Sequence, residues 1–207
     1  MAMAGADFFD IHIRASGSHA AMPHQSVDPI VIGASLVSQL QTIVSRNLPP
    51  TEPLVLSVTQ IHAGSAYNVI PSDCTLSGTM RYFDPSTAKM VRQRIKSLCD
   101  GVAESYGIEV EIDSRNIFDV LVNNDDLSRV MLDVASEVVG VENVAETQNV
   151  VTGSEDFADM LRVVPGAYCT VGHGGTLPLH NDGFVLDESI LPVGASIYAK
   201  IIEQRTA

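Results

Sequence analysis

The stretch Cys74-Thr-Leu-Ser-Gly-Thr-Met-Arg-Tyr-Phe83 places its cysteine, leucine, glycine, methionine and tyrosine at every second position. A period of two is typical of a β-strand that turns one face toward a core. Asp84-Pro-Ser86 follows directly and carries residues that favour the start of a helix. Apolar side chains then recur at helical spacing as far as Tyr106, and Gly107 is suited to end the helix. The stretch therefore predicts a strand followed by an amphipathic helix.

The sequence on either side of this unit extends the same pattern. Through residue 112 the expected order is strand, helix, strand, strand, helix, strand, and this order is typical of a ferredoxin-like fold, one sheet covered on one face by two helices. The further strands are expected at residues 8–14, 54–61 and 108–112, and the further helix runs from about Asp28 to Asn47, with Pro29 at its first turn.

Past Asn116 the pattern changes. We expect a helix from the polar turn at residues 123–126 to Val139, short strands at 150–151 and 168–171, a small helix at 155–161 and a helix at 187–204. These elements do not close a sheet of their own, so they are interpreted as the second half of a larger α/β domain. The fold class is α/β (α+β), with a lid-sized domain over residues 1–116 and a separate segment over 117–207.

Composition excludes several classes of protein. Lys and Arg total 12 against 25 Asp and Glu, giving a net charge of −13, and no basic run offers a track for a phosphate backbone. Three cysteines without C-x-x-C spacing indicate a reducing compartment. No signal peptide and no apolar run long enough to span a bilayer is recognised. We expect a cytoplasmic protein that binds neither nucleic acid nor membrane.

Several histidines in predicted loops are candidates for catalysis or metal binding. His19 and His24 lie five apart with Pro23 between them, which excludes the helical H-E-x-x-H arrangement of a zinc site. His173 and His180 bracket a glycine-containing loop after a predicted strand, where one of them could bind a metal, although the loop is equally interpretable as an exposed polar turn. Catalytic zinc needs about three protein ligands, and no local spacing supplies them.

Other polar residues have both structural and functional interpretations. Arg81 on a strand is suited to hold a carboxylate in a bidentate fork, but it is also interpretable as a surface cation. Glu155-Asp156 is explained by a helix N-terminus. The sequence contains no phosphate-binding glycine motif and no G-x-S-x-G elbow, so a nucleotide-binding protein and a serine hydrolase are disfavoured.

Taken together, a series of motifs in order along the chain resembles the metal-dependent amidohydrolase family that includes hippurate hydrolase, the indole-acetyl amino acid hydrolases and, more distantly, aminoacylase and carboxypeptidase G. The motifs are Gly17-Ser-His-Ala-Ala-Met-Pro-His24, Val27-Asp-Pro-Ile30, Gln41-Thr-Ile-Val-Ser-Arg-Asn47, Asn68-Val-Ile-Pro71, Gly78-Thr-Met-Arg81, Gly153-Ser-Glu-Asp-Phe157 and Leu179-His-Asn181.

The resemblance implies a dimer-forming ferredoxin-like lid inserted in a metallopeptidase domain, in which two divalent metals (Zn, Mn, Co or Ni) activate a water that cleaves amide bonds in N-acyl amino acids or small peptides. By motif, His180 is expected to be a metal ligand. His19 is expected to stabilise the oxyanion in the partner subunit's site. Asn68 and Arg81 are expected to contact substrate, with Gly153 and Ser154 along the substrate cleft.

The sequence also departs from the family. The family's first half carries a His-x-Cys-x-x-His-type motif, a Glu-Glu pair that supplies the general base, and a further histidine, and nothing here corresponds to them. We therefore expect this chain to bind the metal pair incompletely and to be inactive alone. The alternative is a catalytically dead dimerisation or binding module, or one piece of a split enzyme.

Overall fold

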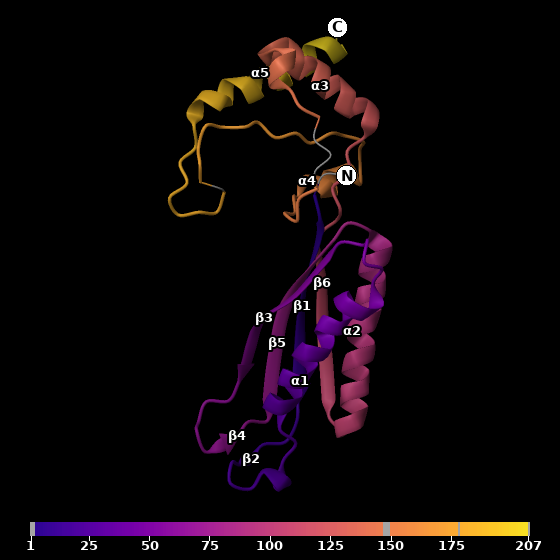
Figure 1. The fold of residues 1–207 in the computed structure, drawn as a ribbon, viewed down its shortest axis with the longest axis vertical. Helices are drawn as coiled ribbons and strands as arrows, with labels where there is room; N and C mark the ends of the chain where they lie inside the picture. Colours follow the sequence, from indigo (N-terminus) through magenta and orange to yellow (C-terminus); the bar gives the residue numbers. More distant parts are fainter. Residues whose placement is uncertain (1–2, 147–149, 178, 207) are drawn as a thin grey trace. The chain divides into compact units, whose positions relative to one another are not determined.

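The computed structural model describes residues 3–146, 150–177 and 179–206 (Figure 1). The chain divides into two compact units. The first comprises Met3–Leu121 and Val150–Ala158, and the second comprises the described residues of Val122–Asn149 and Asp159–Ala207. None of the described helices combines the length and apolar character needed to cross a bilayer.

The first unit is built on one four-stranded antiparallel sheet with the order β3-β5-β1-β6. Its strands are β1 (Gly5–Arg14), β3 (Leu54–Ala63), β5 (Asp73–Tyr82) and β6 (Glu109–Phe118). Helices α1 (Pro29–Thr42) and α2 (Pro85–Tyr106) cover the same face of this sheet (Figure 1). This arrangement confirms the predicted ferredoxin-like fold.

The alternation that predicted β5 is realised in its burial. Cys74, Leu76, Gly78, Met80 and Tyr82 are buried, and the intervening residues are partly exposed. A Cβ on Gly78 would lie 2.2 Å from Cζ of Phe9 and 2.4 Å from the Ser57 carbonyl oxygen, so only glycine fits beneath that ring. The buried residues of this face and of the helices form one core that includes Phe9, Ile11, Ile13, Ile32, Leu36, Leu40, Leu76, Met80, Val91, Ile95 and Cys99.

Both long helices begin and end close to the predicted residues. The Asp28 carboxylate accepts hydrogen bonds from the backbone N–H groups of Ile30 (2.9 Å) and Val31 (3.4 Å), which caps α1. Asp84 caps α2 by accepting from the Ser86 N–H at 3.1 Å, and α2 ends at Gly107 in the left-handed region with φ 62°. The predicted helix to Asn47 is α-helical only to Thr42 and continues as a π-helical turn over Ile43–Asn47.

The loops of the first unit contain short elements that the sequence did not predict. Strands β2 (Ser18–His19) and β4 (Val69–Ile70) pair as a two-stranded ribbon, and Pro23–Gln25 forms a 3-10 turn. Two residues are too few for a detectable period, because alternation is recognised only over about four or more residues.

The second unit contains α3 (Asp125–Val139) and α5 (Leu191–Thr206), which pack on each other. Glu137 of α3 accepts hydrogen bonds from Gln204 at 3.2 Å and pairs with Lys200 at 3.4 Å. Short 3-10 turns lie at Val141–Asn143 and Glu188–Ile190, and α4 spans Phe157–Leu161.

Two predicted strands require correction. Residues 168–171 are not a strand, because no neighbouring strand pairs with them among the described residues. Within residues 150–151, only Val151 forms a β-bridge, which is an isolated one to Met3. Apolar character and β-branching favour an extended backbone, but a strand also requires hydrogen bonds from a second segment.

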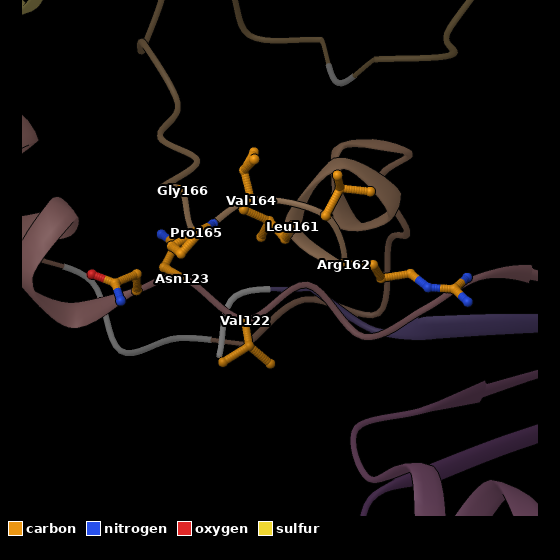
Figure 2. Close-up of a pocket in the computed structure, with 9 residues that line it drawn as sticks. Val122, Asn123, Leu161, Arg162, Val164, Pro165 and Gly166 are labelled. Carbon is orange, nitrogen blue, oxygen red and sulfur yellow. The ribbon is translucent and has the colours of Figure 1, made fainter.

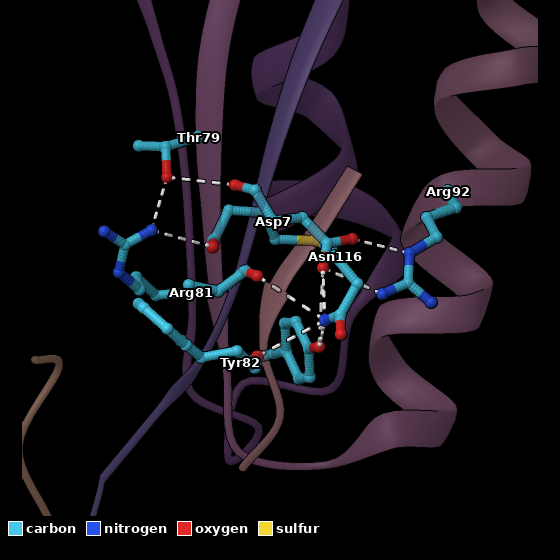
Figure 3. Close-up of polar contacts among 9 residues, drawn as sticks. Asp7, Thr79, Arg81, Tyr82, Arg92 and Asn116 are labelled. Atoms are coloured by element: carbon cyan, nitrogen blue, oxygen red, sulfur yellow. Dashed lines mark hydrogen bonds and ion pairs between the residues drawn. The ribbon is translucent and has the colours of Figure 1, made fainter. Parts of the chain in front are cut away.

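A buried carboxylate links the sheet to α2 in the first unit (Figure 3). The side chain of Asp7 on β1 is 2% exposed and accepts two hydrogen bonds from Arg92 of α2, from Nε at 2.5 Å and from Nη2 at 2.9 Å. Asn116 of β6 donates to the same carboxylate at 3.0 Å, and the Tyr82 hydroxyl donates at 3.4 Å. This cluster connects β1, β5, β6 and α2, and its bidentate geometry is the strong form of an ion pair.

We expect Asp7→Ala to lower the free energy of unfolding of the first unit by about 2 kcal/mol, because it removes the buried carboxylate that accepts hydrogen bonds from Arg92, Asn116 and Tyr82. Urea unfolding followed by circular dichroism measures this change. The control Asp100→Ala removes an exposed i,i+4 pair with Lys96 and is expected to cost about 0.5 kcal/mol or less. Equal effects of the two substitutions would contradict a special role for Asp7.

Burial, reinforced by the charge of Asp7, raises the pKa of Tyr82 to about 12. The folded state therefore binds the phenol proton more tightly than the unfolded chain does. The stability that this difference contributes is fully present below pH 10 and is lost as the pH rises toward 12. We expect the unfolding free energy to fall across this window in the parent and less steeply in Tyr82→Phe. Urea titrations at several pH values measure both slopes, and identical slopes would contradict the assignment.

Candidate functional site

The ribbon of β2 and β4 brings together two predicted site residues that lie far apart in the sequence. His19 pairs with Val69 in the ribbon, and the Ala20 N–H donates to the Asn68 carbonyl oxygen at 3.0 Å. A Cβ on Gly17 would lie 2.4 Å from the Ile70 carbonyl oxygen, so the close approach of the two segments requires glycine there. His19 and Asn68 are therefore neighbours, and both are exposed.

The local hydrogen bonds orient the His19 ring. Its Nδ1 accepts from the Ala21 N–H at 3.1 Å, so the neutral ring carries its proton on Nε2. The Asn68 side chain makes no hydrogen bond to other described residues. The ribbon thus presents an Nε2–H donor and an amide to solvent, and both groups are suited to stabilise a negatively charged oxygen.

Arg81 lies at the opposite end of the sheet. It pairs with Ala6 of β1 and Val55 of β3, whereas the ribbon follows the end of the sheet where Arg14 pairs with Asp73. Arg81 lies eight positions further along β5 than Asp73, a distance of about 26 Å at roughly 3.3 Å per residue. Arg81 therefore does not share a small binding site with His19 in the same subunit.

The Arg81 guanidinium is held by neutral groups. Its Nη1 donates to the Thr79 hydroxyl and to the Met80 carbonyl oxygen at 3.1 Å, and Thr79 in turn donates to the Asp7 carbonyl oxygen at 3.1 Å (Figure 3). Within the described part of the chain, no carboxylate forms an ion pair with Arg81. Its charge and remaining donors are available to a substrate carboxylate.

Gly153 and Ser154 lie at the Arg81 end of the first unit. The Ala4 N–H donates to the carbonyl oxygens of Val151 (3.2 Å) and Gly153 (3.0 Å), just before β1 begins. The Ser154 Oγ is buried and has no hydrogen-bond partner among the described residues. The structure thus sorts the predicted residues of this unit into two groups, His19 with Asn68 and Arg81 with Gly153 and Ser154.

His180 lies in the second unit, exposed and with φ 66°, an uncommon conformation for a residue other than glycine. His173 from the same loop has local partners. Its Nδ1 accepts from the Gly175 N–H at 3.1 Å, and its ring packs edge-on against Phe184 with centroids 5.2 Å apart. Hydrogen bonds from Ser189 lower the pKa of Asp187, and the nearby His173 adds to this effect. The contacts of His173 therefore lie within its own loop, and His180 remains the metal-ligand candidate.

The described residues do not supply a metal site. No group of three or more His, Cys, Asp or Glu side chains gathers among residues 3–146, 150–177 and 179–206. A catalytic zinc ion takes about three protein ligands. The described side chains therefore do not fit a metal pair by themselves.

Comparison with known proteins gives the family. The sequence profile of the peptidase dimerisation domain matches residues 2–107, and the chain belongs to the M20 family of amidohydrolases and peptidases. Campylobacter jejuni hippurate hydrolase is 32% identical over 199 residues, covering 96% of this chain and 52% of the relative. Bacillus subtilis N-acetylcysteine deacetylase is 34% identical over 204 residues, with coverages of 96% and 52%. The chain thus spans about half the length of these relatives.

Solved structures of M20-type proteins are similar in fold to this chain. A putative aminohydrolase from methicillin-resistant Staphylococcus aureus superposes with a TM-score of 0.81 at 25% identity, covering 97% of this chain and 52% of that one. A Bacillus subtilis protein described as a dinuclear metal-binding peptidase of the M20 family gives a TM-score of 0.72 at 27% identity, with coverages of 97% and 49%. These matches support the ferredoxin-like dimerisation fold.

Proposed function

We propose that this chain supplies the lid (residues 1–116) and the C-terminal segment of the catalytic domain (residues 117–207) of an amidohydrolase that cleaves amide bonds in N-acyl amino acids or small peptides. The names of two relatives, hippurate hydrolase and N-acetylcysteine deacetylase, describe N-acyl amino acid substrates. A pair of divalent metals, Zn, Mn, Co or Ni, would activate the water in the complete enzyme, with His180 as one ligand. A cytoplasmic location is consistent with three free cysteines.

The main support for this proposal is the distance between the two groups of candidate site residues in the first unit. His19 and Asn68 lie about 26 Å or more along β5 from Arg81, too far to contact one small substrate. In a dimer all three residues can contact the same substrate, because the ribbon of one subunit can reach the site that contains Arg81 of the other subunit. In such a composite site His19 and Asn68 stabilise the oxyanion, and Arg81 holds the free carboxylate of the amino acid.

The distribution of charge indicates the dimer surface. Residues 15–45 contain a single Asp, Glu, Lys or Arg, the capping residue Asp28, and residues 53–72 contain none. These ranges include α1 and β3, which contact each other and expose Val31 (61%) and Ile61 (50%). In contrast, α2 carries Lys89, Arg92, Arg94, Lys96, Asp100 and Glu104. Interface cores are depleted of charge, and β3 is also an edge strand with unpaired backbone groups.

We expect the chain to be a dimer and the double substitution Val31→Lys with Ile61→Lys to make it a monomer, because two buried lysines per subunit would be unpaired in the interface. Light scattering after size exclusion measures the mass. The matched control Gln93→Lys with Ser97→Lys adds the same two charges to the exposed face of α2 and is expected to leave the dimer intact. A parent chain that is monomeric at micromolar concentration would contradict the proposed interface.

We expect the 207-residue chain with added Zn²⁺, Mn²⁺ or Co²⁺ to hydrolyse N-acetyl and N-benzoyl amino acids no faster than background, because its described residues gather no metal-ligand group. Fusion to the portion of Campylobacter jejuni hippurate hydrolase that this chain does not match is expected to give metal-dependent turnover. Turnover by the chain alone at the rate of the fusion would contradict this account.

The fused enzyme also tests the composite site. His19→Ala and Arg81→Ala are each expected to be inactive, but mixing them with subunit exchange should restore about a quarter of the parental activity, since half of the dimers then contain one intact site of two. If both residues acted within one subunit, the mixture would stay inactive.

The alternative function is a dimerisation or binding module without catalysis, or one piece of a split enzyme. The observation in its favour is that the described residues form no group of three metal-binding side chains. A dimeric fusion protein that binds N-acyl amino acids without hydrolysing them would support the binding module.

A further inference from the structure

The face of the first unit's sheet that the helices leave open carries arginines with different partners. Arg14 and Arg115 on this face each form ion pairs with two carboxylates. Arg81 instead donates to the Thr79 hydroxyl and to the Met80 carbonyl oxygen. The guanidinium of Arg81 is thus held in place by neutral groups, and its charge is suited to a carboxylate from a ligand.

The hydrogen bond to Thr79 determines which residues surround the Arg81 guanidinium. Thr79 lies two residues before Arg81 on the same strand and the same face, so the arginine side chain folds back over Thr79 (Figure 3). In the sheet, Thr79 pairs with Phe8 of β1 on one side and with Ser57 of β3 on the other. Directly opposed side chains have Cβ atoms about 5 Å apart, so Phe8 and Ser57 flank the guanidinium.

Two large apolar side chains beside Arg81 are exposed. Phe8 is 43% exposed, and Val55, which pairs with Arg81 from β3, is 40% exposed. Their chain neighbours Phe9 and Leu56 are buried in the core, so alternation along each strand turns Phe8 and Val55 toward the open face. An exposed apolar surface beside a cation without a carboxylate partner suits a ligand that combines a carboxylate with an apolar group.

We propose that Phe8, together with Val55, binds the side chain of the amino acid whose carboxylate Arg81 holds. The enzyme then prefers N-acyl amino acids with apolar side chains, such as leucine and phenylalanine, over those of glycine and glutamate. The side chain and the carboxylate of an amino acid are bonded to the same carbon, so neighbouring residues of the sheet contact both groups. This inference rests on the proposed function, in which Arg81 binds the free carboxylate.

The charges beyond Phe8 disfavour an acidic side chain on the substrate. Asp10 is the next residue of β1 on the open face, and its carboxylate accepts from Ser77 at 2.5 Å and pairs with Arg115. A substrate carboxylate that extended past Phe8 would approach this like charge. A basic side chain would gain little from Asp10, because that carboxylate already has two donors. An apolar side chain needs no charged partner at this position.

An apolar depression in the second unit is a poorer candidate for this role. It has a volume of about 380 Å³, and its lining includes Val122, Leu161 and Val164 (Figure 2). Arg162 also lines it, but its side chain points away from Val122 and Val164 in Figure 2 and pairs with Asp159 at 3.5 Å. The depression therefore offers apolar contacts without a cation available for the carboxylate of the same amino acid.

Ligand binding to the full 207-residue chain, followed by NMR, measures this preference without catalysis. We expect N-acetyl-L-leucine to shift the amide resonances of Phe8 and Thr79 and to bind about tenfold more tightly than N-acetylglycine, because its side chain buries apolar area on Phe8. N-acetyl-L-glutamate should bind no more tightly than N-acetylglycine. Arg81→Ala should abolish the binding of all three ligands.

The variant Phe8→Ala tests the assignment of the apolar contact. It should reduce the preference for N-acetyl-L-leucine to about twofold and leave the affinity for N-acetylglycine within about twofold of the parent. The matched control Tyr106→Ala removes an aromatic side chain of similar exposure, 47%, from α2 and should leave the preference unchanged. Circular dichroism checks that both variants fold.

Three results would overturn the inference: equal affinity of the parent chain for N-acetyl-L-leucine and N-acetylglycine, an unchanged preference in Phe8→Ala, and no saturable binding of either ligand. The fusion with the hippurate hydrolase portion separates this inference from the proposed function. A leucine preference in binding without hydrolysis by the fusion would contradict the proposed function and leave the role of Phe8 intact. Hydrolysis of both N-acetyl amino acids with equal kcat/KM and equal affinity would contradict only the role of Phe8.

Discussion

The arrangement of the first unit depends on the pairing of β1 with β5, ten residues each in continuous antiparallel register from Gly5–Tyr82 to Arg14–Asp73. This pair forms the centre of the sheet and carries much of the core through residues such as Ile11 and Leu76. Its length also sets the distance between the two groups of site residues. Because an extended strand is stiff, the ribbon at one end and Arg81 at the other remain apart, and this constraint is the basis of the proposed composite site between subunits.

At the Arg81 end, the ion pair between the buried Asp7 carboxylate and Arg92 couples this strand pair to α2, and Asn116 couples it to β6. A charged group in a nearly fully buried position is tolerated here because guanidinium, amide and phenol donors surround it. The same strands position Arg81 through Thr79 and the Asp7 carbonyl oxygen. Asp7 therefore contributes to both, through its carboxylate to the ion-pair cluster and through its carbonyl oxygen to the Thr79 hydroxyl that accepts from Arg81.

The two units differ in how much of their apolar surface they bury. The first has a closed core between one sheet face and two helices, and its uncharged side, α1 with β3, is suited to association with a second copy. The second has two packed helices and an extended segment but almost no buried apolar side chains among its described residues. The first unit therefore buries a continuous apolar core, whereas the described residues of the second unit bury little apolar surface.

The sequence alone determined the ferredoxin-like unit, because alternation in residues 74–83 and the caps Asp28, Asp84 and Gly107 are local signals. Motif resemblance also selected His19, Asn68, Arg81, Gly153, Ser154 and His180 as candidates. Local signals did not reveal the β2–β4 ribbon, the partner of Asp7, or the division of the candidates between two ends of a sheet, because each depends on residues distant in the sequence. For the same reason the strand predicted at 168–171 was wrong for the chain by itself, since its apolar pattern is local but its hydrogen-bond partner is not.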